Sequence, residues 1–276
     1  MVEEGALAPV TRPPQPTLDL VPFHRYVALG DSFAEGVGDP DHTGPNGVRG
    51  WADRVAAVLA EQTPDFSYAN LAIRGRKLDG VLAEQIETAV ALEPDLITIY
   101  AGANDIMRPK VDIDALVERY DAGLGKLAGT GARLLVFTAF DPGGSAIYRP
   151  LRGRFALYNE LVRWAADRHG ATIVDFWRFR ELRDWRYWDR DRLHLGPAGH
   201  QWMAIQVLEV LGIPHGVDQP DLPEEVVLTR ADRYRANADW TRTHFAPWIQ
   251  RRLTGRSSGD SVLPKRPGLL PWEHRD

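Results

Sequence analysis

Short runs of apolar, β-favouring residues alternate five times with helical patterns, and this alternation constrains the fold more than any other feature. The connections between successive strand patterns are far too long for hairpins, so we expect parallel strands with helices on both faces of one sheet. The sequence therefore predicts an α/β protein with a five-stranded parallel sheet. The predicted strands cover residues 25–29, 66–71, 96–100, 134–140 and 172–176, and the predicted helices cover residues 50–62, 78–90, 113–127, 155–165 and 197–211.

The alternating pattern ends near residue 213, and the sequence on either side of it differs in character. Four prolines between residues 9 and 16 indicate an extended N-terminal arm. The predicted organisation is an arm over residues 1–20, an α/β domain over residues 21–213, and a C-terminal helical extension and tail over residues 214–276.

The C-terminal extension is expected to pack on the α/β domain. Residues 230–252 have a helical pattern that contains Trp240 and Trp248. Each of these side chains can bury about 150–250 Å², so we expect them to be packing anchors and the helix to supply most of the contact. The apolar segment 269–272 is a further candidate for docking on the body.

Composition and charge exclude several kinds of partner. The net charge of −5 argues against a nucleic acid partner, because phosphate binding requires a basic face. The chain has no cysteine, which excludes disulfides and thiolate metal sites and fits the cytoplasm. No apolar run approaches the roughly 20 residues of a membrane span, and Glu3 and Glu4 stand where a signal peptide is basic. We therefore expect a cytoplasmic protein without integral membrane association.

Polar stretches occur at the ends of the predicted strands. Residues 30–32, 70–75 and 102–105 follow the first three strands, and residues 191–194 precede the last helix. The carboxyl ends of parallel strands share one edge of the sheet, which is where open α/β folds bind ligands. We expect the first three loops to converge there and the fourth to reach the same edge.

Ser32 is the candidate nucleophile of this edge. It follows the first predicted strand, and a serine held there becomes reactive if a base reaches its hydroxyl. His194 is the candidate base, and Asp191, three residues before it, is the candidate carboxylate that orients the imidazole. The negative charge of a tetrahedral intermediate needs hydrogen-bond donors. The available donors are the backbone N–H groups of Ser32 and Gly75 and the side-chain amide of Asn104.

Each of these residues also has a purely structural interpretation. Ser32 with Glu35 fits a capping box, and Asn104 fits a helix or turn cap. Gly75 fits an ordinary turn, and the stretch 191–194 fits an exposed loop before a helix that starts with proline. The joint occurrence of the four stretches at strand ends favours the catalytic interpretation. The arginines at 149, 152 and 154 are expected to form a solvated face, with a clamp for an anionic substrate as the alternative.

The four stretches together resemble the SGNH hydrolases, also called the GDSL esterase and lipase family. The resemblance covers about residues 25–212 and rests on residues 30–33, 70–75, 102–105 and 191–194, in the order of the family. It implies a flavodoxin-like three-layer α/β/α sandwich. It also implies that Ser32 is the nucleophile, His194 the general base and Asp191 its orienting acid, with Ser32, Gly75 and Asn104 forming the oxyanion hole. Phe33 replaces the leucine of the GDSL motif.

The leading functional prediction is a serine hydrolase that cleaves carboxylic esters without a metal or a cofactor. The expected substrate is a small-molecule ester with a short acyl or acetyl group, and acetylated sugars and lysophospholipids also fit the family. One alternative is a metal-dependent phosphoester hydrolase that uses Asp31, Asn104, Asp191 and His194 as hard ligands. The other alternative is a catalytically silent binding protein.

Overall fold

The computed structural model describes residues 22–145, 147–224, 229–254 and 257–272. The predicted N-terminal arm over residues 1–20 lies outside the described residues, and so does the side chain of Trp248. No helix in the described ranges is long and apolar enough to cross a membrane.

One six-stranded sheet forms the centre of the molecule, with the strand order β5-β4-β3-β1-β2-β6. The first five strands along the chain pair in parallel, as predicted, and β2-β1-β3-β4-β5 is the doubly wound order of flavodoxin. The prediction of five strands is wrong by one, because β6 adds an antiparallel strand at the edge of β2. The strands are β1 (Arg25–Gly30), β2 (Ser67–Asn70), β3 (Leu96–Tyr100), β4 (Arg133–Phe137), β5 (Thr172–Val174) and β6 (Arg266–Pro271).

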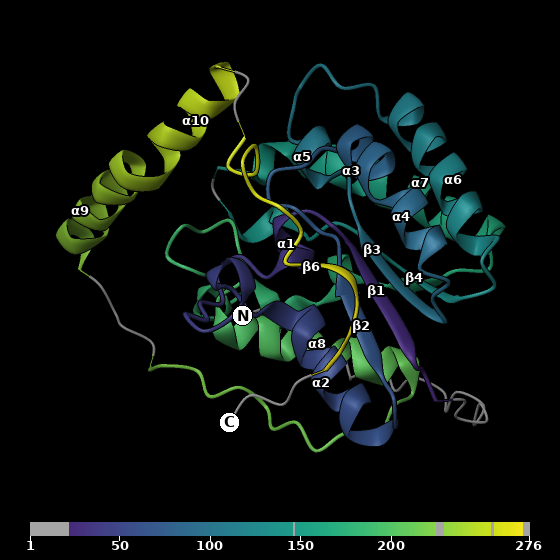
Figure 1. Cartoon of the computed structure of the whole chain (residues 1–276). Helices are drawn as coiled ribbons and strands as arrows, with labels where there is room; N and C mark the ends of the chain where they lie inside the picture. Colours follow the sequence, from purple (N-terminus) through teal and green to yellow (C-terminus); the bar gives the residue numbers. More distant parts are fainter. Residues whose placement is uncertain (1–21, 146, 225–228, 255–256, 273–276) are drawn as a thin grey trace, which may run out of the picture.

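Helices cover both faces of the sheet (Figure 1). Helices α2 and α8 pack together on one face, and α3, α4, α6 and α7 cover the other. The four strands β1 to β4 are buried on both sides along most of their length, which explains their near-continuous apolar sequences. The helices of the domain are α1 (Ser32–Glu35), α2 (Gly50–Gln62), α3 (Leu78–Glu84), α4 (Ile86–Ala91), α5 (Ala103–Ile106), α6 (Ile113–Ala128), α7 (Arg152–Arg168) and α8 (Pro197–Leu211).

Short 3₁₀ turns fill the longer connections. The segment between β5 and α8, which shows no clean periodicity in the sequence, contains three of them. The turns are η1 (Pro45–Gly47), η2 (Pro142–Gly144), η3 (Arg149–Leu151), η4 (Phe176–Arg178), η5 (Arg180–Arg183) and η6 (Trp185–Tyr187).

The helix predicted over residues 78–90 is two helices, α3 and α4, that meet at Gln85. The Gln85 side chain is buried and bonds both backbone groups of Gly30: Oε1 accepts from the N–H at 2.8 Å, and Nε2 donates to the carbonyl at 2.9 Å. The break in the helix therefore lies where a polar side chain supports the end of β1.

Strand β6 comes from the C-terminal tail and covers the edge of the sheet. Its sequence contains Pro267, Gly268 and Pro271, which are unfavourable in a central strand. An edge strand tolerates proline because one row of its N–H groups has no ladder partner to lose. By pairing with β2, the tail becomes part of the sheet, which explains why a strand here is hard to predict from residue preferences alone.

Lys265, directly before β6, anchors the tail in the interior. Its side chain is fully buried, and Nζ donates to Oδ2 of Asp53 at 2.9 Å and to the carbonyl of Glu35 at 2.6 Å. Oδ1 of Asp53 accepts from the hydroxyl of Tyr68 at 2.9 Å, so both carboxylate oxygens are satisfied. A buried ion pair thus joins the tail to helix α2, and a hydrogen bond to a backbone carbonyl joins it to the end of α1.

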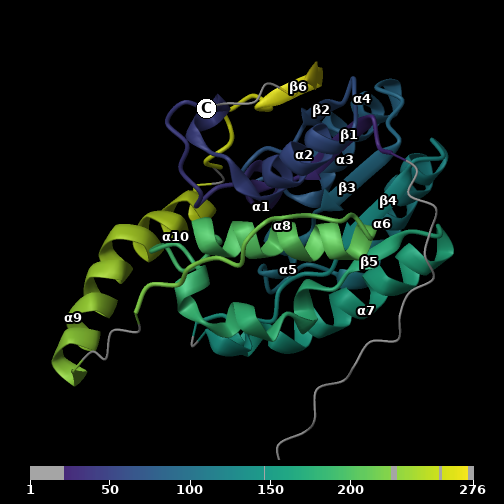
Figure 2. The same cartoon turned by 90° about the horizontal axis from the view of Figure 1, so that it is seen from below.

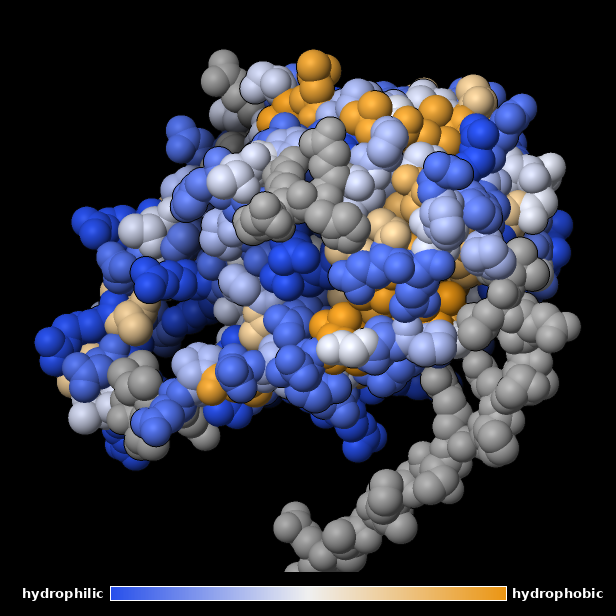
Figure 3. Space-filling model, turned by 60° about the horizontal axis from the view of Figure 1, so that its bottom comes forward, coloured by the Kyte–Doolittle hydropathy of each residue, from blue (hydrophilic) through white to orange (hydrophobic). Residues whose placement is uncertain are grey.

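The predicted helix of the extension is a continuous rod that projects from the domain (Figures 1 and 2). It consists of α9 (Arg230–Trp240), a π-helical turn η7 (Thr241–Phe245) and α10 (Ala246–Leu253). Most of α9 is exposed and its surface is largely hydrophilic (Figure 3), while Trp240 is buried. The expectation that this helix supplies most of the contact is wrong: β6 and Lys265 attach the extension more extensively.

Candidate active site

Ser32, His194 and Asp191 form one hydrogen-bonded row beyond the carboxyl end of β1. Nε2 of His194 lies 2.9 Å from Oγ of Ser32, and Nδ1 lies 2.5 Å from Oδ2 of Asp191. A carboxylate accepts hydrogen bonds, so Nδ1 carries the proton and Nε2 is free to accept from the serine hydroxyl. This arrangement allows the imidazole to withdraw the proton of Ser32 when Oγ attacks.

The capping-box interpretation of Ser32 is wrong. The N-cap of α1 is Asp31, whose carboxylate accepts from the N–H of Phe33 at 3.1 Å, and Ser32 is the first helical residue. Glu35 is buried and binds the guanidinium of Arg74, with Nη2 to Oε1 at 2.6 Å. Because Asp31 caps the helix, the hydroxyl of Ser32 is left for His194.

A tight turn holds Asp191 and His194 in register. Oδ1 of Asp191 accepts from the N–H groups of Leu193 and His194 at 2.9 and 3.0 Å. Arg192 adopts a positive φ of 57°, which lets the chain reverse within these four residues. Burial acts to raise the pKa of Asp191, but the hydrogen bonds and charge of His194 lower it to about 2. Asp191 therefore remains a carboxylate over the whole physiological pH range.

Donors for an oxyanion surround Ser32. Within the described ranges, the backbone N–H groups of Ser32 and Gly75 donate to no protein acceptor. Asn104 does not cap a helix, because Gly102 is the N-cap of α5. Its Nδ2 donates to Oδ2 of Asp31 and to the carbonyl of Arg76, both at 3.0 Å. Both hydrogens of the amide are therefore in use, while the two backbone donors are available.

Asp31 supports this arrangement as a buried carboxyl. It is 2% exposed and receives hydrogen bonds from Phe33 and Asn104. Burial raises the pKa of Asp31 to about 7, although the bond from Phe33 and the charge of His194 oppose the rise. Its position below Asn104 makes it the group that orients the amide.

Gly75 lies where the C-terminal tail approaches the site. Its φ is 75°, and a Cβ atom there would come within 2.1 Å of Oγ of Ser257. Gly75 is thus more than an ordinary turn residue, because it combines a left-handed conformation with a close contact. The tail segment 257–258 and the turn η7 both border the pocket above Ser32.

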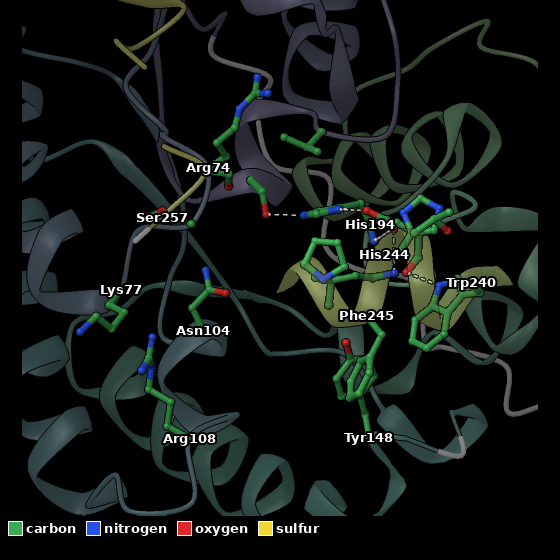
Figure 4. Close-up of a pocket in the computed structure, with 18 residues that line it drawn as sticks. Arg74, Lys77, Asn104, Arg108, Tyr148, His194, Trp240, His244, Phe245 and Ser257 are labelled. Atoms are coloured by element: carbon green, nitrogen blue, oxygen red, sulfur yellow. Dashed lines mark hydrogen bonds and ion pairs between the residues drawn. The ribbon is translucent and has the colours of Figure 1, made fainter. Parts of the chain in front are cut away.

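Two cavities meet at Ser32. The larger has a volume of about 480 Å³ and lies between the domain, the tail and η7 (Figure 4). The smaller has a volume of about 40 Å³ and lies beneath Ser32, Asn104 and His194. The apolar side chains that line the smaller cavity are those of Phe33, Tyr100, Met107, Phe140, Phe176 and Trp188.

Sequence reasoning missed two residues that hold the site. Gln85 fixes the backbone of Gly30, and its signal is a polar residue on the buried stripe that contains Val81 and Ile86. Trp240 donates from its indole nitrogen to the carbonyl of Asp191 at 3.0 Å. The sequence marks Trp240 only as an anchor, since nothing local indicates which loop it meets.

The residues considered for a metal site and for an arginine clamp do not form such sites in the described part of the chain. In the part of the chain that the structure describes, no three His, Asp or Glu side chains are grouped to hold a metal ion. Of the three arginines considered as a clamp, Arg152 pairs with Asp141, and Arg154 donates to the carbonyls of Ile106 and Val111. Neither of these two arginines lines the cavities at Ser32.

The fold and the sequence define the class of protein. Residues 28–202 match the GDSL-like lipase/acylhydrolase family, and the chain belongs to this family of hydrolases, which confirms the resemblance to SGNH esterases. The chain is similar to an acetylxylan esterase of Geobacillus stearothermophilus, with 26% identity over 209 residues that cover 68% of this chain and 94% of that protein.

Solved structures share the same fold. LAE5, an alpha/beta hydrolase enzyme from the metagenome of Lake Arreo, is 23% identical with a TM-score of 0.57, over 68% of this chain and 95% of LAE5. The psychrotrophic esterase EstA from Pseudoalteromonas sp. is 16% identical with a TM-score of 0.54, over 68% of this chain and 96% of EstA.

Proposed function

We propose that this chain is a serine esterase that removes short acyl groups, acetyl above all, from a larger alcohol. The observation that carries the proposal is the row of Ser32, His194 and Asp191 between a very small apolar cavity and a much larger cavity with both charged and aromatic lining residues. A water-sized group needs about 10–15 Å³, so the small cavity has room for roughly three such groups, which suits an acetyl group.

The reaction follows from the hydrogen bonds of the row. Oγ of Ser32 attacks the ester carbonyl while Nε2 of His194 takes its proton, and Asp191 stabilises the imidazolium that results. The carbonyl oxygen gains the negative charge and accepts hydrogen bonds from the N–H groups of Ser32 and Gly75 and the amide of Asn104. The imidazolium then protonates the alcohol oxygen as the C–O bond breaks, which leaves an acyl group on Ser32.

Water completes the cycle by the same route. His194 takes a proton from the water that attacks the acyl carbonyl, and the imidazolium returns a proton to Oγ as the acyl group leaves. Deacetylation agrees with the acetylxylan esterase to which the chain is similar. The proposal concerns the acyl group, and the alcohol occupies the larger cavity.

A comparison of two serine variants tests the nucleophile. With 4-nitrophenyl acetate, we expect Ser32→Ala to lower kcat by at least about 10³-fold, because it removes the nucleophile of the triad. Ser67→Ala is the matched control, since Ser67 lies at the start of β2 and its hydroxyl donates to the carbonyl of His24. A fluorophosphonate probe should label Ser32. Activity that survives in Ser32→Ala and disappears with EDTA would instead support the metal-dependent alternative.

A methionine pair tests the acyl cavity. Met107 lines the small cavity and is 7% exposed, while Met203 is fully buried in α8 and does not line it. We expect wild-type kcat/KM to fall steeply from acetate to butyrate esters, and Met107→Ala to raise the butyrate-to-acetate ratio by making room. Met203→Ala should leave the ratio unchanged while it destabilises the core by about 2–5 kcal/mol. Equal ratios in all three proteins would contradict the assignment of this cavity to the acyl group.

A further inference from the structure

We infer that the larger cavity binds esters whose alcohol part carries an oxyanion, a carboxylate or a phosphate, and that Lys77 and Arg108 hold this group. The inference rests on the proposed esterase function and names the substrate class of the same site. It goes beyond the choice of acyl group, because the acyl group occupies the smaller cavity.

Positive charge is concentrated around the larger cavity. The chain as a whole has a net charge of −5, yet the described residues that line this cavity include three Lys or Arg side chains and one carboxylate. That carboxylate, Asp191, is already bonded to His194. A cavity lined by one sign of charge attracts ligands of the other sign. The lining cations are Arg74, Lys77 and Arg108, and His194 and His244 are the lining histidines.

The three cations differ in whether the protein already uses them. The guanidinium of Arg74 is bound to Glu35 through Nε at 3.0 Å and Nη2 at 2.6 Å. Within the described ranges, the head groups of Lys77 and Arg108 form no ion pair or hydrogen bond, and Nε of Arg108 is buried without an acceptor. An oxyanion bound in the cavity would give these two head groups a partner that the described residues do not supply.

Nearby acids do not neutralise these two cations. Asp105 is buried, and its Oδ2 accepts from the N–H of Leu78 at 2.9 Å. Burial raises the pKa of Asp105, while the charges of Lys77 and Arg108 act against the rise without forming an ion pair with it. Asp79 is exposed and binds Arg119. Both cations therefore keep their charge available to the cavity.

The cations lie beside the residues that would bind the ester carbonyl. Lys77 follows Gly75 by two residues, and Arg108 follows Asn104 by four, so each extends a loop that carries an oxyanion donor. Figure 4 shows Lys77 and Arg108 on the side of Asn104, across the cavity from His194 and Trp240. A substrate whose acyl group sits below Ser32 can thus extend its alcohol part toward the cations.

The opposite wall supplies apolar surface for the body of the alcohol. Trp240 and Phe245 stack with their ring centroids 5.6 Å apart, and Tyr148 also lines the cavity. One wall is thus cationic and the other aromatic, which fits a ring-shaped alcohol with an acidic substituent.

Two acetates of equal shape test the inference. We expect kcat/KM for 4-acetoxybenzoate to exceed that for the neutral 4-acetoxybenzamide by about tenfold, mainly through KM, since charge-assisted hydrogen bonds hold the carboxylate. The ratio should decrease between 0.01 and 1 M NaCl, because salt screens the attraction. Equal values for both acetates would overturn the inference and leave the esterase function standing.

Variants locate the anion site. The double change Lys77→Met with Arg108→Met should bring the ratio of the two acetates close to one, while the charge-conserving Lys77→Arg with Arg108→Lys should retain most of it. Lys110→Met is the matched control, because Lys110 is exposed and does not line the cavity. A ratio that survives the double change to methionine would show that another group holds the anion.

A binding measurement separates this inference from the esterase function. Calorimetric titration with the products 4-hydroxybenzoate, 4-hydroxyphenyl phosphate and 4-hydroxybenzamide requires no turnover. The anion site is supported if either oxyanion binds more tightly than the amide and if this preference is lost in the double methionine variant. The product that binds more tightly shows whether the natural group is a carboxylate or a phosphate. Such binding without hydrolysis of any acetate would contradict the esterase function alone, whereas equal binding of all three would contradict the anion site alone.

Discussion

The indole nitrogen of Trp240 donates a hydrogen bond of 3.0 Å to the backbone carbonyl of Asp191. The same ring lies 5.0 Å from the guanidinium of Arg192, whose Nη1 donates to Asn237 at 2.8 Å. The C-terminal extension therefore contacts the turn that holds Asp191 and His194 together. The extension therefore borders the mouth of the candidate active site, which cannot be inferred from the sequence.

Replacement of Trp240 by phenylalanine removes this hydrogen bond and keeps an aromatic ring beside Phe245. We expect kcat to fall by about threefold to tenfold, which corresponds to the net value of one hydrogen bond, with little change in KM. The control is Trp164→Phe, because Trp164 is half exposed on α7 and contacts Arg168. An equal loss of activity in both variants, or a loss explained by a lower Tm, would make Trp240 a structural residue without a positioning role.

Asn104→Ala is expected to lower kcat by about 10²- to 10³-fold, because the amide acts mainly on the transition state. The two backbone donors remain, so some activity should persist. A change confined to KM would assign Asn104 to substrate binding.

His200 should make stability depend on pH. The ring is fully buried, accepts from the N–H of Trp51 and donates to the carbonyl of Val37, and burial lowers its pKa to about 4 from 6.5. Between these values the unfolded chain binds one more proton than the folded chain, so stability falls as pH falls. The loss amounts to about 3 kcal/mol across the window.

Urea unfolding at pH 7 and pH 4.5 checks this expectation. His200→Gln keeps a donor for Val37 but has no group that titrates in this range, so the difference between the two pH values should shrink. The exposed His42→Gln variant should retain the wild-type difference. The prediction fails if His200→Gln and His42→Gln show the same dependence on pH.

Lys265→Met should destabilise the protein by about 3–5 kcal/mol, because it leaves the carboxylate of Asp53 buried without its cation. Lys126 forms an ion pair with Glu87, and these two side chains are 62% and 70% exposed. Lys126→Met should therefore lower the free energy of unfolding by less than about 1 kcal/mol. Urea midpoints measure both. Similar midpoints for the two variants would mean that Lys265 does not anchor the tail.

The sequence by itself determined the parallel sheet and the residues Ser32, His194 and Asp191 that form the hydrogen-bonded row at its edge. Alternating strand and helix patterns require parallel strands, and parallel strands bring their carboxyl ends to one edge. Ser32, Gly75 and Asn104 follow three such ends, so their proximity comes from topology rather than from detailed packing. Asp191 and His194 are only three residues apart in one turn, so their hydrogen bonds to each other can be predicted from their spacing in the sequence.

Only the tertiary structure decided what the C-terminal part of the chain does. Strand β6 contains two prolines, and its strand conformation depends on the open edge of β2 rather than on its own residues. Lys265 finds Asp53 across 212 residues, and Trp240 finds Asp191 across 49. The head groups of Lys77 and Arg108 have no partner among the described residues, whereas Arg74 and Asp191 beside the same cavity are paired with Glu35 and His194. Periodicity and spacing encode neighbours within an element or along one sheet edge. A single lysine or tryptophan carries no local pattern, so its partner depends on how the distant segments pack.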